Sequence, residues 1–317
     1  MNLPRRALPG LFAFGLPVIA RAEAFPARPV RLVTPVPSGV GAEATIRLFA
    51  DGLSRRWGQP VTVENRPGGD GVIAAMAFLG LQDNHKLLLS FAGLFTVNPA
   101  TIPNLPYRTE QFASVSTVAI DHIAVVASPA LQAANLADAV RLARAGAGTL
   151  TWASSPGGIA IAFAAFAAEQ GISLTRVQYR AVPDMLNDLG EGRIQLAVMP
   201  LATALPQARG GRLKLLAVTN STRSAAAPDL ATAAEQGFPK YEFEGFVGVF
   251  ADARQPATVR RALEEATRAI VSDDAFASRV RTAGQTPFAG GAADLHARII
   301  AQGGLVEAGL RHLPPGG

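Results

Sequence analysis

Short apolar runs alternate with amphipathic stretches along most of the chain. The run at 30–36 predicts a buried strand, the pattern at 44–58 predicts an amphipathic helix, and 60–65 predicts a second strand. Further strands and helices alternate up to about residue 220, and from Ala257 onward the pattern is helical. This alternation is typical of parallel sheets with helices on both faces. We therefore expect an α/β protein built from mostly parallel sheets.

Length and composition favour a folded protein with two domains. The chain has 317 residues, of which 49% are hydrophobic and 17% are charged, so it can bury a large core. Its net charge of +5 is modest, and no basic run interleaved with aromatic residues marks a surface for nucleic acid. Cysteine is absent, which excludes disulfides and thiolate chemistry. We expect no nucleic-acid partner.

Residues 1–24 have the pattern of a secretory signal peptide. Arg5 and Arg6 form a basic start, Ala7–Ala20 is a short apolar run, and the following AEA fits a cleavage site. The apolar run is shorter than the roughly 20 residues that span a bilayer. We expect export to the periplasm, a mature chain that begins near Phe25, and no stable insertion into a membrane.

A glycine-rich loop joins the first predicted strand to the first predicted helix. Its residues 39–44, GVGAEA, match the pattern of dinucleotide-binding loops, and Glu64 ends the next strand, where a ribose-binding acid would lie. This leaves open an NAD(P)-dependent enzyme with a Rossmann-like first lobe. Against that alternative, Pro35 and Pro37 lengthen the turn, and exported enzymes rarely meet free nicotinamide cofactor. A helix N-terminus offers free N–H groups to a carboxylate as readily as to a phosphate.

A second loop, in the stretch WASSPGGIAIAF, has the same design. A predicted strand passes through Ser154 and Ser155, then Gly157 and Gly158, into a helix. The two hydroxyl groups and the N–H groups from Gly157 to Ile159 can hold another polar group. Two such loops favour two lobes that each offer a helix N-terminus to one small ligand.

Motifs for catalysis or metal binding are missing from the sequence. The four histidines, His85, His122, His296 and His312, are scattered without the spacing of metal ligands, and no G-x-S-x-G nucleophile elbow occurs. We therefore expect no catalytic residue, no metal and no cofactor, and a protein that is not an enzyme. Asp121 and His122 lie where the chain would first cross between lobes, which favours a hinge role.

Several segments in register resemble one family of receptors. They include FPARPVRLVTPVPSGVGAEA, WGQPVTVENRPGGDGVIAA, LTWASSPGG, RVQYRAVPDMLNDLGEGRIQLAV and APDLATAAEQGFPKYEFEGFVGVFA. From about Phe25 to about Leu310, the chain resembles the solute-binding receptors of tripartite tricarboxylate transporters, also called Bug receptors. The resemblance implies a two-lobed periplasmic-binding-protein fold of type II, the Venus-flytrap architecture. It also implies a small carboxylate in the cleft between the lobes and a membrane permease as partner.

The resemblance further implies how the chain divides. The expected segments are a signal peptide at 1–24, a first lobe from 25–120 plus 222–317, and a second lobe at 121–221. Hinges are expected near Val118–Val126 and near Val218–Arg223. Receptors that open and close in solution are commonly monomers, so we expect a monomer. A sensory or scavenging binding protein stays open as an alternative, since a permease would be encoded elsewhere.

The ligand-binding loops of the family fall on particular residues of this chain. The family loop P-x-P-P-G-G-G-T-D falls on residues 35–43, and the loop S-S-G-x-G-T/S-x falls on 154–160. Backbone donors persist, whereas several side-chain donors are lost, so we expect an acid whose body is more apolar than that of citrate. Glu43 fits the first turn of its helix better as a cap than as a ligand contact.

Three residues outside the loops complete the candidate site. Arg180 can pair with a carboxylate through two hydrogen bonds, and Tyr179 and Phe91 are candidates to line the cleft. The candidate ligand-binding residues are Pro37, Ser38, Gly39, Val40, Gly41, Ala42, Phe91, Ser154, Ser155, Gly157, Gly158, Ile159, Tyr179 and Arg180.

Overall fold

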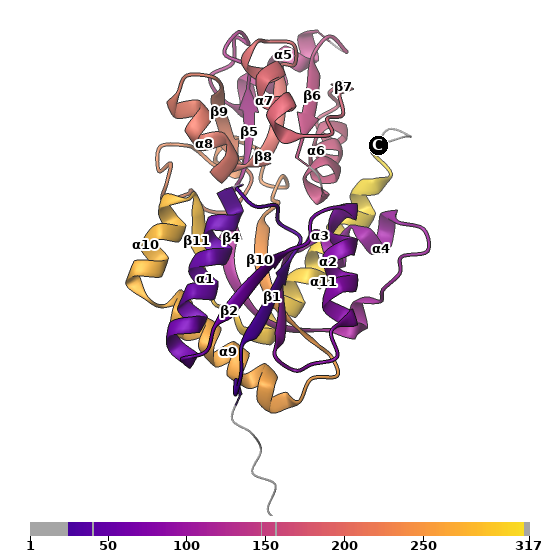
Figure 1. The fold of residues 1–317 in the computed structure, drawn as a ribbon. Coiled ribbons are helices and arrows are strands. Elements are labelled where there is room, and N and C mark those ends of the chain that lie inside the picture. Colours follow the sequence, from indigo (N-terminus) through magenta and orange to yellow (C-terminus); the bar gives the residue numbers. More distant parts are fainter. Residues whose placement is uncertain (1–24, 40, 147, 156, 314–317) are drawn as a thin grey trace, which may run out of the picture.

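Two lobes, each a sheet covered by helices, make up the chain in the computed structural model (Figure 1). The structure describes residues 25–39, 41–146, 148–155 and 157–313. The expected signal peptide at 1–24 and the candidate site residue Val40 lie outside the described residues. Among the described residues, none of the helices combines the length and the apolar character needed to cross a membrane.

Within the described residues, the first lobe contains six strands and the helices that cover them. Its strands are β1 (Val30–Thr34), β2 (Val61–Asn65), β3 (Lys86–Phe91), β4 (Phe112–Asp121), β10 (Gly245–Asp252) and β11 (Gln285–Pro287), in the spatial order β11-β4-β10-β3-β1-β2. Its α-helices are α1 (Gly41–Trp57), α2 (Val72–Gly80), α3 (Gly93–Thr96), α4 (Asn98–Thr101), α9 (Ala257–Val271), α10 (Asp274–Thr282) and α11 (Gly291–Leu310). Short 3₁₀ turns cover Gly69–Gly71 and Thr109–Gln111.

The second lobe, where the structure describes it, contains five strands. They are β5 (Ile123–Ala127), β6 (Thr151–Ser154), β7 (Thr175–Arg176), β8 (Leu196–Pro200) and β9 (Lys214–Val218), in the spatial order β7-β6-β8-β5-β9. The helices are α5 (Leu136–Ala145), α6 (Gly158–Glu169), α7 (Val182–Gly190) and α8 (Leu201–Arg209), and a 3₁₀ turn covers Ala234–Gln236.

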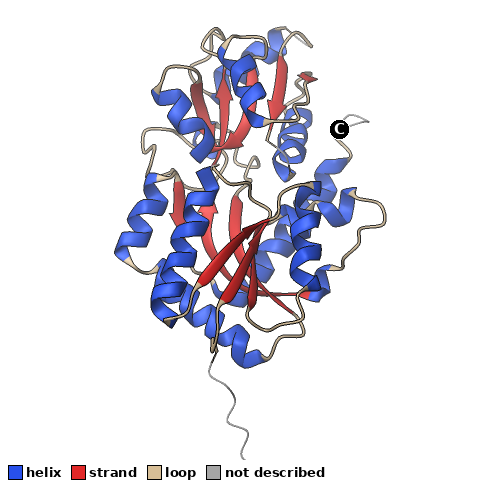
Figure 2. Cartoon of the chain, viewed as in Figure 1, coloured by secondary structure: helices blue, strands red, loops and turns tan. Residues whose placement is uncertain are grey.

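Each sheet is buried on both faces, as Figure 2 shows by its flanking helices. Successive side chains of a strand point to opposite faces. In β1, Leu32 therefore packs into one core with Phe49 of α1, whereas Val33 packs into the other core with Phe78 of α2. In β6, Trp152 and Ala153 divide between two cores in the same way. Strands buried on both faces carry continuous apolar runs, which is why the sequence pattern locates them.

Both sheets are mixed, with most strands of each sheet running in one direction, and the two-lobed α/β architecture is confirmed. The pairs β1–β2, β1–β3, β6–β7 and β6–β8 are parallel, whereas β10 and β5 run antiparallel to both of their neighbours. The reason lies in how the chain enters these two strands. Strands β5 and β10 both begin at the edge of their sheet that faces the other lobe, because the chain has just crossed from that lobe. They run away from this edge, whereas their neighbouring strands end at it.

The chain passes between the lobes at two places. The first passage lies at Asp121–Ile123, between β4 and β5, and the second leads from Phe243 into β10. Residues 222–243, which the sequence assigned to the first lobe, pack against the second sheet, where Tyr241 and Phe243 share a core with Trp152. The packing therefore puts the second passage at about residue 244.

Helix α11 contacts both lobes. Leu295 in its first half is fully buried in the core of the first lobe. Near its end, Gly309 packs so closely on α6 that a Cβ atom would lie 2.6 Å from Ile161. Val306 approaches Gly158 at the start of α6, and Leu313 packs against the core of the second lobe. The C-terminal helix is thus a further connection between the lobes.

Candidate functional site

The first glycine loop leaves its sheet at the edge that faces the second lobe. In the parallel part of the sheet, Thr34 at the end of β1 lies opposite Asn65 at the end of β2. Phe91 at the end of β3 lies opposite Val247, close to where β10 enters from the second lobe. The carboxyl ends of these strands therefore meet at the interlobe edge, where open α/β sheets commonly bind ligands.

The second loop leaves its sheet at the matching edge. Ile123, the first residue of β5, pairs with Pro200 at the end of β8, and Ser154 at the end of β6 lies opposite Val198. The loop from Ser154 to Gly158 therefore emerges on the side of the second sheet that faces the first lobe. The two loops singled out from the sequence lie on facing edges of the two lobes (Figure 1).

The first loop is closed by a carboxylate of its own chain. Gly39, with a φ of 85°, donates its backbone N–H to Glu43 Oε2 at 2.9 Å, and Arg47 Nε donates to Glu43 Oε1 at 2.6 Å. These hydrogen bonds, first that of Gly39 and then that of Arg47, hold the pKa of Glu43 below its usual value. Glu43 is buried and caps the start of α1, whereas Pro37, Ser38 and Gly39 are exposed.

The second loop combines an exposed glycine with a tightly packed one. Gly157 is exposed and has a φ of 94°, a conformation that favours glycine. Gly158 is buried, and a Cβ atom there would lie 2.9 Å from the ring of Phe243. Ser155 is anchored because its backbone N–H donates to Val198 O at 2.9 Å. The side chain of Ile159 packs into the core, so Ile159 can offer only its backbone to a ligand.

The three candidates outside the loops differ in their surroundings. Tyr179 and Arg180 follow β7, which runs parallel to β6, so they leave the sheet at the same edge as Ser154. The hydroxyl of Tyr179 donates to Asp188 Oδ2 at 2.6 Å, and burial together with this carboxylate raises the pKa of Tyr179 to about 12. Arg180 is exposed. Phe91 is half-buried at the end of β3 and packs against the core of the first lobe.

Glu64, the residue expected to bind a ribose in the dinucleotide alternative, forms ion pairs with arginines instead. Glu64 forms ion pairs with Arg66 at 3.3 Å and with Arg31 at 3.9 Å. Among the described residues, no cluster of three or more acidic or histidine side chains is arranged to hold a metal ion.

Two asparagines beside the loops and the first passage were not among the candidate site residues. Asn65 Nδ2 donates to Val36 O at 2.8 Å and so ties the first loop to the end of β2. Asn220 Nδ2 donates to Asp121 O at 3.1 Å, and its Oδ1 accepts from the N–H of Ile123 at 3.0 Å. Asn220 thereby binds the backbone on both sides of His122 and stabilises the first passage between the lobes. The only signal in the sequence is a polar residue at the end of an apolar run, which is too common to be diagnostic.

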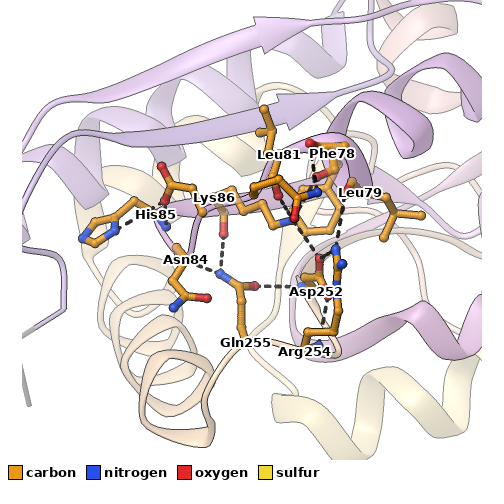
Figure 3. A network of polar contacts seen from close by, with 12 residues as sticks. Phe78, Leu79, Leu81, Asn84, His85, Lys86, Asp252, Arg254 and Gln255 are labelled. Atoms are coloured by element: carbon orange, nitrogen blue, oxygen red, sulfur yellow. Dashed lines mark hydrogen bonds and ion pairs between the residues drawn. The ribbon is translucent and has the colours of Figure 1, made fainter.

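A second polar cluster lies at the opposite end of the first lobe, where β3 begins and β10 ends (Figure 3). The buried Lys86 Nζ donates to Asp252 Oδ2 at 2.7 Å and to the carbonyl oxygens of Phe78 and Leu81 at 3.1 and 2.6 Å. Burial raises the pKa of Asp252, but the hydrogen bonds from Arg254 and Lys86 outweigh it and hold the pKa well below the usual range. All three ammonium protons are used, so the cluster stabilises the fold and leaves Lys86 no donor for a ligand.

The comparisons with known proteins agree on one family. The family model described as the tripartite tricarboxylate transporter family receptor matches residues 45–305. Protein BugT of Bordetella pertussis is 28% identical over 294 residues, which is 89% of this chain and 90% of that protein. A UPF0065 protein of Bordetella bronchiseptica is 31% identical over 280 residues, 86% of this chain and 81% of the relative.

Solved structures extend this agreement to the fold. The structure described as R. palustris Rpa4515 with adipate has a TM-score of 0.82 and 27% identity, and the match covers 91% of this chain and 98% of that chain. The periplasmic binding protein BugD has a TM-score of 0.77 and 24% identity over 91% of this chain and 98% of its own. The two facing glycine loops thus occur in a fold of binding proteins, and the chain belongs to the tripartite tricarboxylate transporter receptor family, the Bug receptors.

Proposed function

We propose that this chain is a periplasmic receptor that captures a small organic carboxylate between its lobes and delivers it to a tripartite-transporter permease. The observation that carries the proposal is the arrangement of two glycine loops on facing edges, each leading into a helix N-terminus. Backbone N–H groups and the positive end of the helix dipole favour a negatively charged group at both places.

The proposed contacts come mainly from the backbone. In the first loop they involve residues 37–42, and in the second loop Ser154, Ser155 and the N–H groups from Gly157 to Ile159. Phe91 and the ring of Tyr179 would line the space beside them, with Arg180 at its rim. Few of these groups are side-chain donors, which favours a ligand with an apolar body. Adipate, which fits that description, is named with the R. palustris relative.

Closure of the lobes supplies the mechanism. In the open form a ligand contacts only one of the two glycine loops. When the lobes approach each other, the ligand also gains the contacts of the second loop. The ligand therefore shifts the population toward the closed form by its difference in affinity for the two forms. The passages at Asp121–Ile123 and near residue 244 are the proposed hinges.

A thermal-shift screen of residues 25–317 tests the ligand class. The probes are adipate, hexanoate, malate, citrate and benzoate, with NAD and NADP as the alternative class. A ligand at about 100 times its Kd adds about 2.7 kcal/mol of stability, which such a screen detects. We expect stabilisation by adipate or hexanoate and none by nucleotides. Stabilisation by NAD or NADP alone would overturn the proposal in favour of a dinucleotide enzyme.

A pair of glycine variants tests the location of the site. Gly39→Glu adds bulk and negative charge at the first loop, and we expect it to abolish binding of adipate. Gly58→Glu is the matched control, because Gly58 also has a positive φ and open space around it but lies at the far end of α1. Equal affinity of the two variants for adipate would move the site away from the first loop.

A further inference from the structure

A buried chain of hydrogen bonds links helix α1 to the first passage between the lobes. Thr45 Oγ1 in α1 donates to Gln285 Oε1 at 2.6 Å, and Gln285 Nε2 donates to Asp121 Oδ1 at 2.6 Å. The three residues are only 1%, 2% and 5% exposed. Buried polar groups must keep their partners, so the position of each member constrains the next.

The strand that carries Gln285 also touches the second lobe. Its neighbour Thr286 is hydrogen-bonded through Oγ1 to His122 Nε2 at 2.9 Å, within the passage itself. Gly284, just before β11, lies so close to α8 that a Cβ atom there would be 3.2 Å from the Cα atom of Ala202. The segment 284–286 therefore contacts the helix that follows the first glycine loop, the passage and the opposite lobe.

We infer that Gln285 is a positioning residue that couples the arrangement of the two lobes to the ligand-binding end of α1, and that the proton of Asp121 controls this coupling. The inference rests on the proposed function, because the first glycine loop leads directly into α1. Thr45 lies one turn after the start of that helix, two residues beyond Glu43, whose carboxylate closes the loop.

Protonation of Asp121 changes the hydrogen bonds that are open to the side chain of Gln285. An ionised Asp121 accepts from Gln285 Nε2, which leaves Gln285 Oε1 turned toward Thr45. A protonated Asp121 carries an O–H donor that competes with Thr45 for Gln285 Oε1, so the link to α1 loosens. Burial raises the pKa of Asp121 to about 6, partly offset by the hydrogen bond from Gln285. We therefore expect the link between Gln285 and α1 to loosen as the pH falls through about 6.

The charged groups around Asp121 are engaged elsewhere. His122 follows it in the chain, and burial lowers the pKa of His122. Glu244 precedes the neighbouring β10 strand and pairs with Arg298 of α11. Glu43 of α1 pairs with Arg47, and β11 and the second passage present the uncharged Gln285 and Asn220. None of the ion pairs among the described residues involves Asp121, and its carboxylate accepts a hydrogen bond from the uncharged Gln285.

Hydrogen exchange of the ligand-free protein tests the coupling independently of ligand binding. The readout is the protection of the α1 amides from Thr45 to Phe49, the first that can bond within the helix, at about pH 5 and about pH 7.5, corrected for intrinsic exchange. We expect protection in the wild type to fall about fivefold at the lower pH, and to be independent of pH in Asp121→Asn, which has no proton to gain in this range. Thr45→Val should give low protection at both pH values, and Thr45→Ser should restore the wild-type profile.

A matched control separates coupling from loss of a buried hydroxyl. Thr267→Val makes the same change at a fully buried threonine of α9, whose hydroxyl bonds only within its helix to Leu263 O. We expect this variant to behave as the wild type. Equal protection of α1 in Thr45→Val and Thr267→Val would overturn the inference.

Titration with adipate at the same two pH values completes the test. We expect the affinity of the wild type to fall about threefold at the lower pH and that of Asp121→Asn to stay constant. A change in protection without a change in affinity would overturn the inference while leaving the proposed function intact. Failure of all the acids in the screen to bind the wild type would instead overturn the proposed function and, with it, this role of Gln285.

Discussion

Glu43 accepts a hydrogen bond from the backbone N–H of Gly39 at 2.9 Å, so the first glycine loop binds a carboxylate of its own chain. Arg47 binds the other carboxylate oxygen. An acidic residue is therefore compatible with a loop for anions, because its charge is paired and its hydrogen bond orders the turn. The same arrangement places a fixed negative charge beside the proposed ligand.

Glu43→Gln should strengthen the binding of acids. The variant keeps an oxygen that can accept from Gly39 but removes the charge that repels a carboxylate, so the affinity for adipate should rise about threefold. Stability should fall by less than about 1 kcal/mol, because the ion pair with Arg47 and a favourable interaction with the helix dipole are lost. Calorimetric titration and urea unfolding measure the two effects. Glu110→Gln removes the same charge at an exposed position and is the control; a tenfold loss of affinity in Glu43→Gln alone would contradict the capping role.

Asp121→Asn should stabilise the protein at neutral pH. The pKa of Asp121 in the folded state, about 6, lies above the ordinary value of 3.8. The folded state therefore holds this proton more tightly, and the resulting stabilisation is fully present below about pH 4 and is lost as the pH rises through about 6. Above that range a buried charge remains, and its removal should add on the order of 2 kcal/mol. Urea unfolding from about pH 4 to 7.5 should show the advantage of the variant growing with pH; the exposed Asp51→Asn should show no such trend.

Lys86→Met should destabilise the first lobe without affecting ligand binding. It leaves Asp252 buried without its ammonium partner and frees two backbone carbonyl groups, at a cost of about 3 kcal/mol. Arg254→Met removes the exposed partner of the same carboxylate and should cost about 1 kcal/mol. Chemical unfolding gives both values. A change in adipate affinity that exceeds the change caused by Arg254→Met would show that this remote cluster is connected to the site.

Tyr179→Phe should leave the affinity for adipate unchanged within about twofold. The hydroxyl that it removes is already donated to Asp188, so only the ring is available to a ligand. Stability should fall by about 1 kcal/mol, the usual contribution of such a hydrogen bond. Titration with adipate tests the first statement, and a tenfold loss of affinity would assign the hydroxyl to the ligand instead.

The sequence pattern was sufficient for most elements and for the two-lobed fold, because strands buried on both faces carry continuous apolar runs such as Val30–Thr34. It missed β10, and it missed β11, which lies in the stretch after Ala257 that was expected to be helical. Strand direction was not predictable in the same way. The direction of β10 and β5 depends on which lobe the chain has just left, and the apolar run alone carries no such information. The second passage was placed too early because residues 222–243 are irregular, and only the packing of Tyr241 and Phe243 assigns them to the second lobe.

The glycine loops were visible in the sequence because they are local, with glycines and serines next to one another between a strand and a helix. The chain from Thr45 through Gln285 to Asp121 was not visible, because its members are far apart in sequence and meet only when β11 pairs with β4. The hydrogen bonds of Asn220 were not visible for the same reason, because their partners Asp121 and Ile123 are far away in the sequence. Contacts that set the geometry of a passage between lobes depend on tertiary structure, whereas backbone anion sites depend on short motifs.

The C-terminal helix α11 contains two adjacent glycines at the border between the lobes. Up to Gln302, which accepts from Thr96 and donates to the carbonyl oxygen of Glu244, α11 is fastened to the first lobe. From Val306 onward it rests on α6. Between these sections lie Gly303 and Gly304, and adjacent glycines are among the few places where a helix bends sharply. We therefore expect α11 to bend at these two glycines when the lobes move, so that the whole helix need not detach from the first lobe.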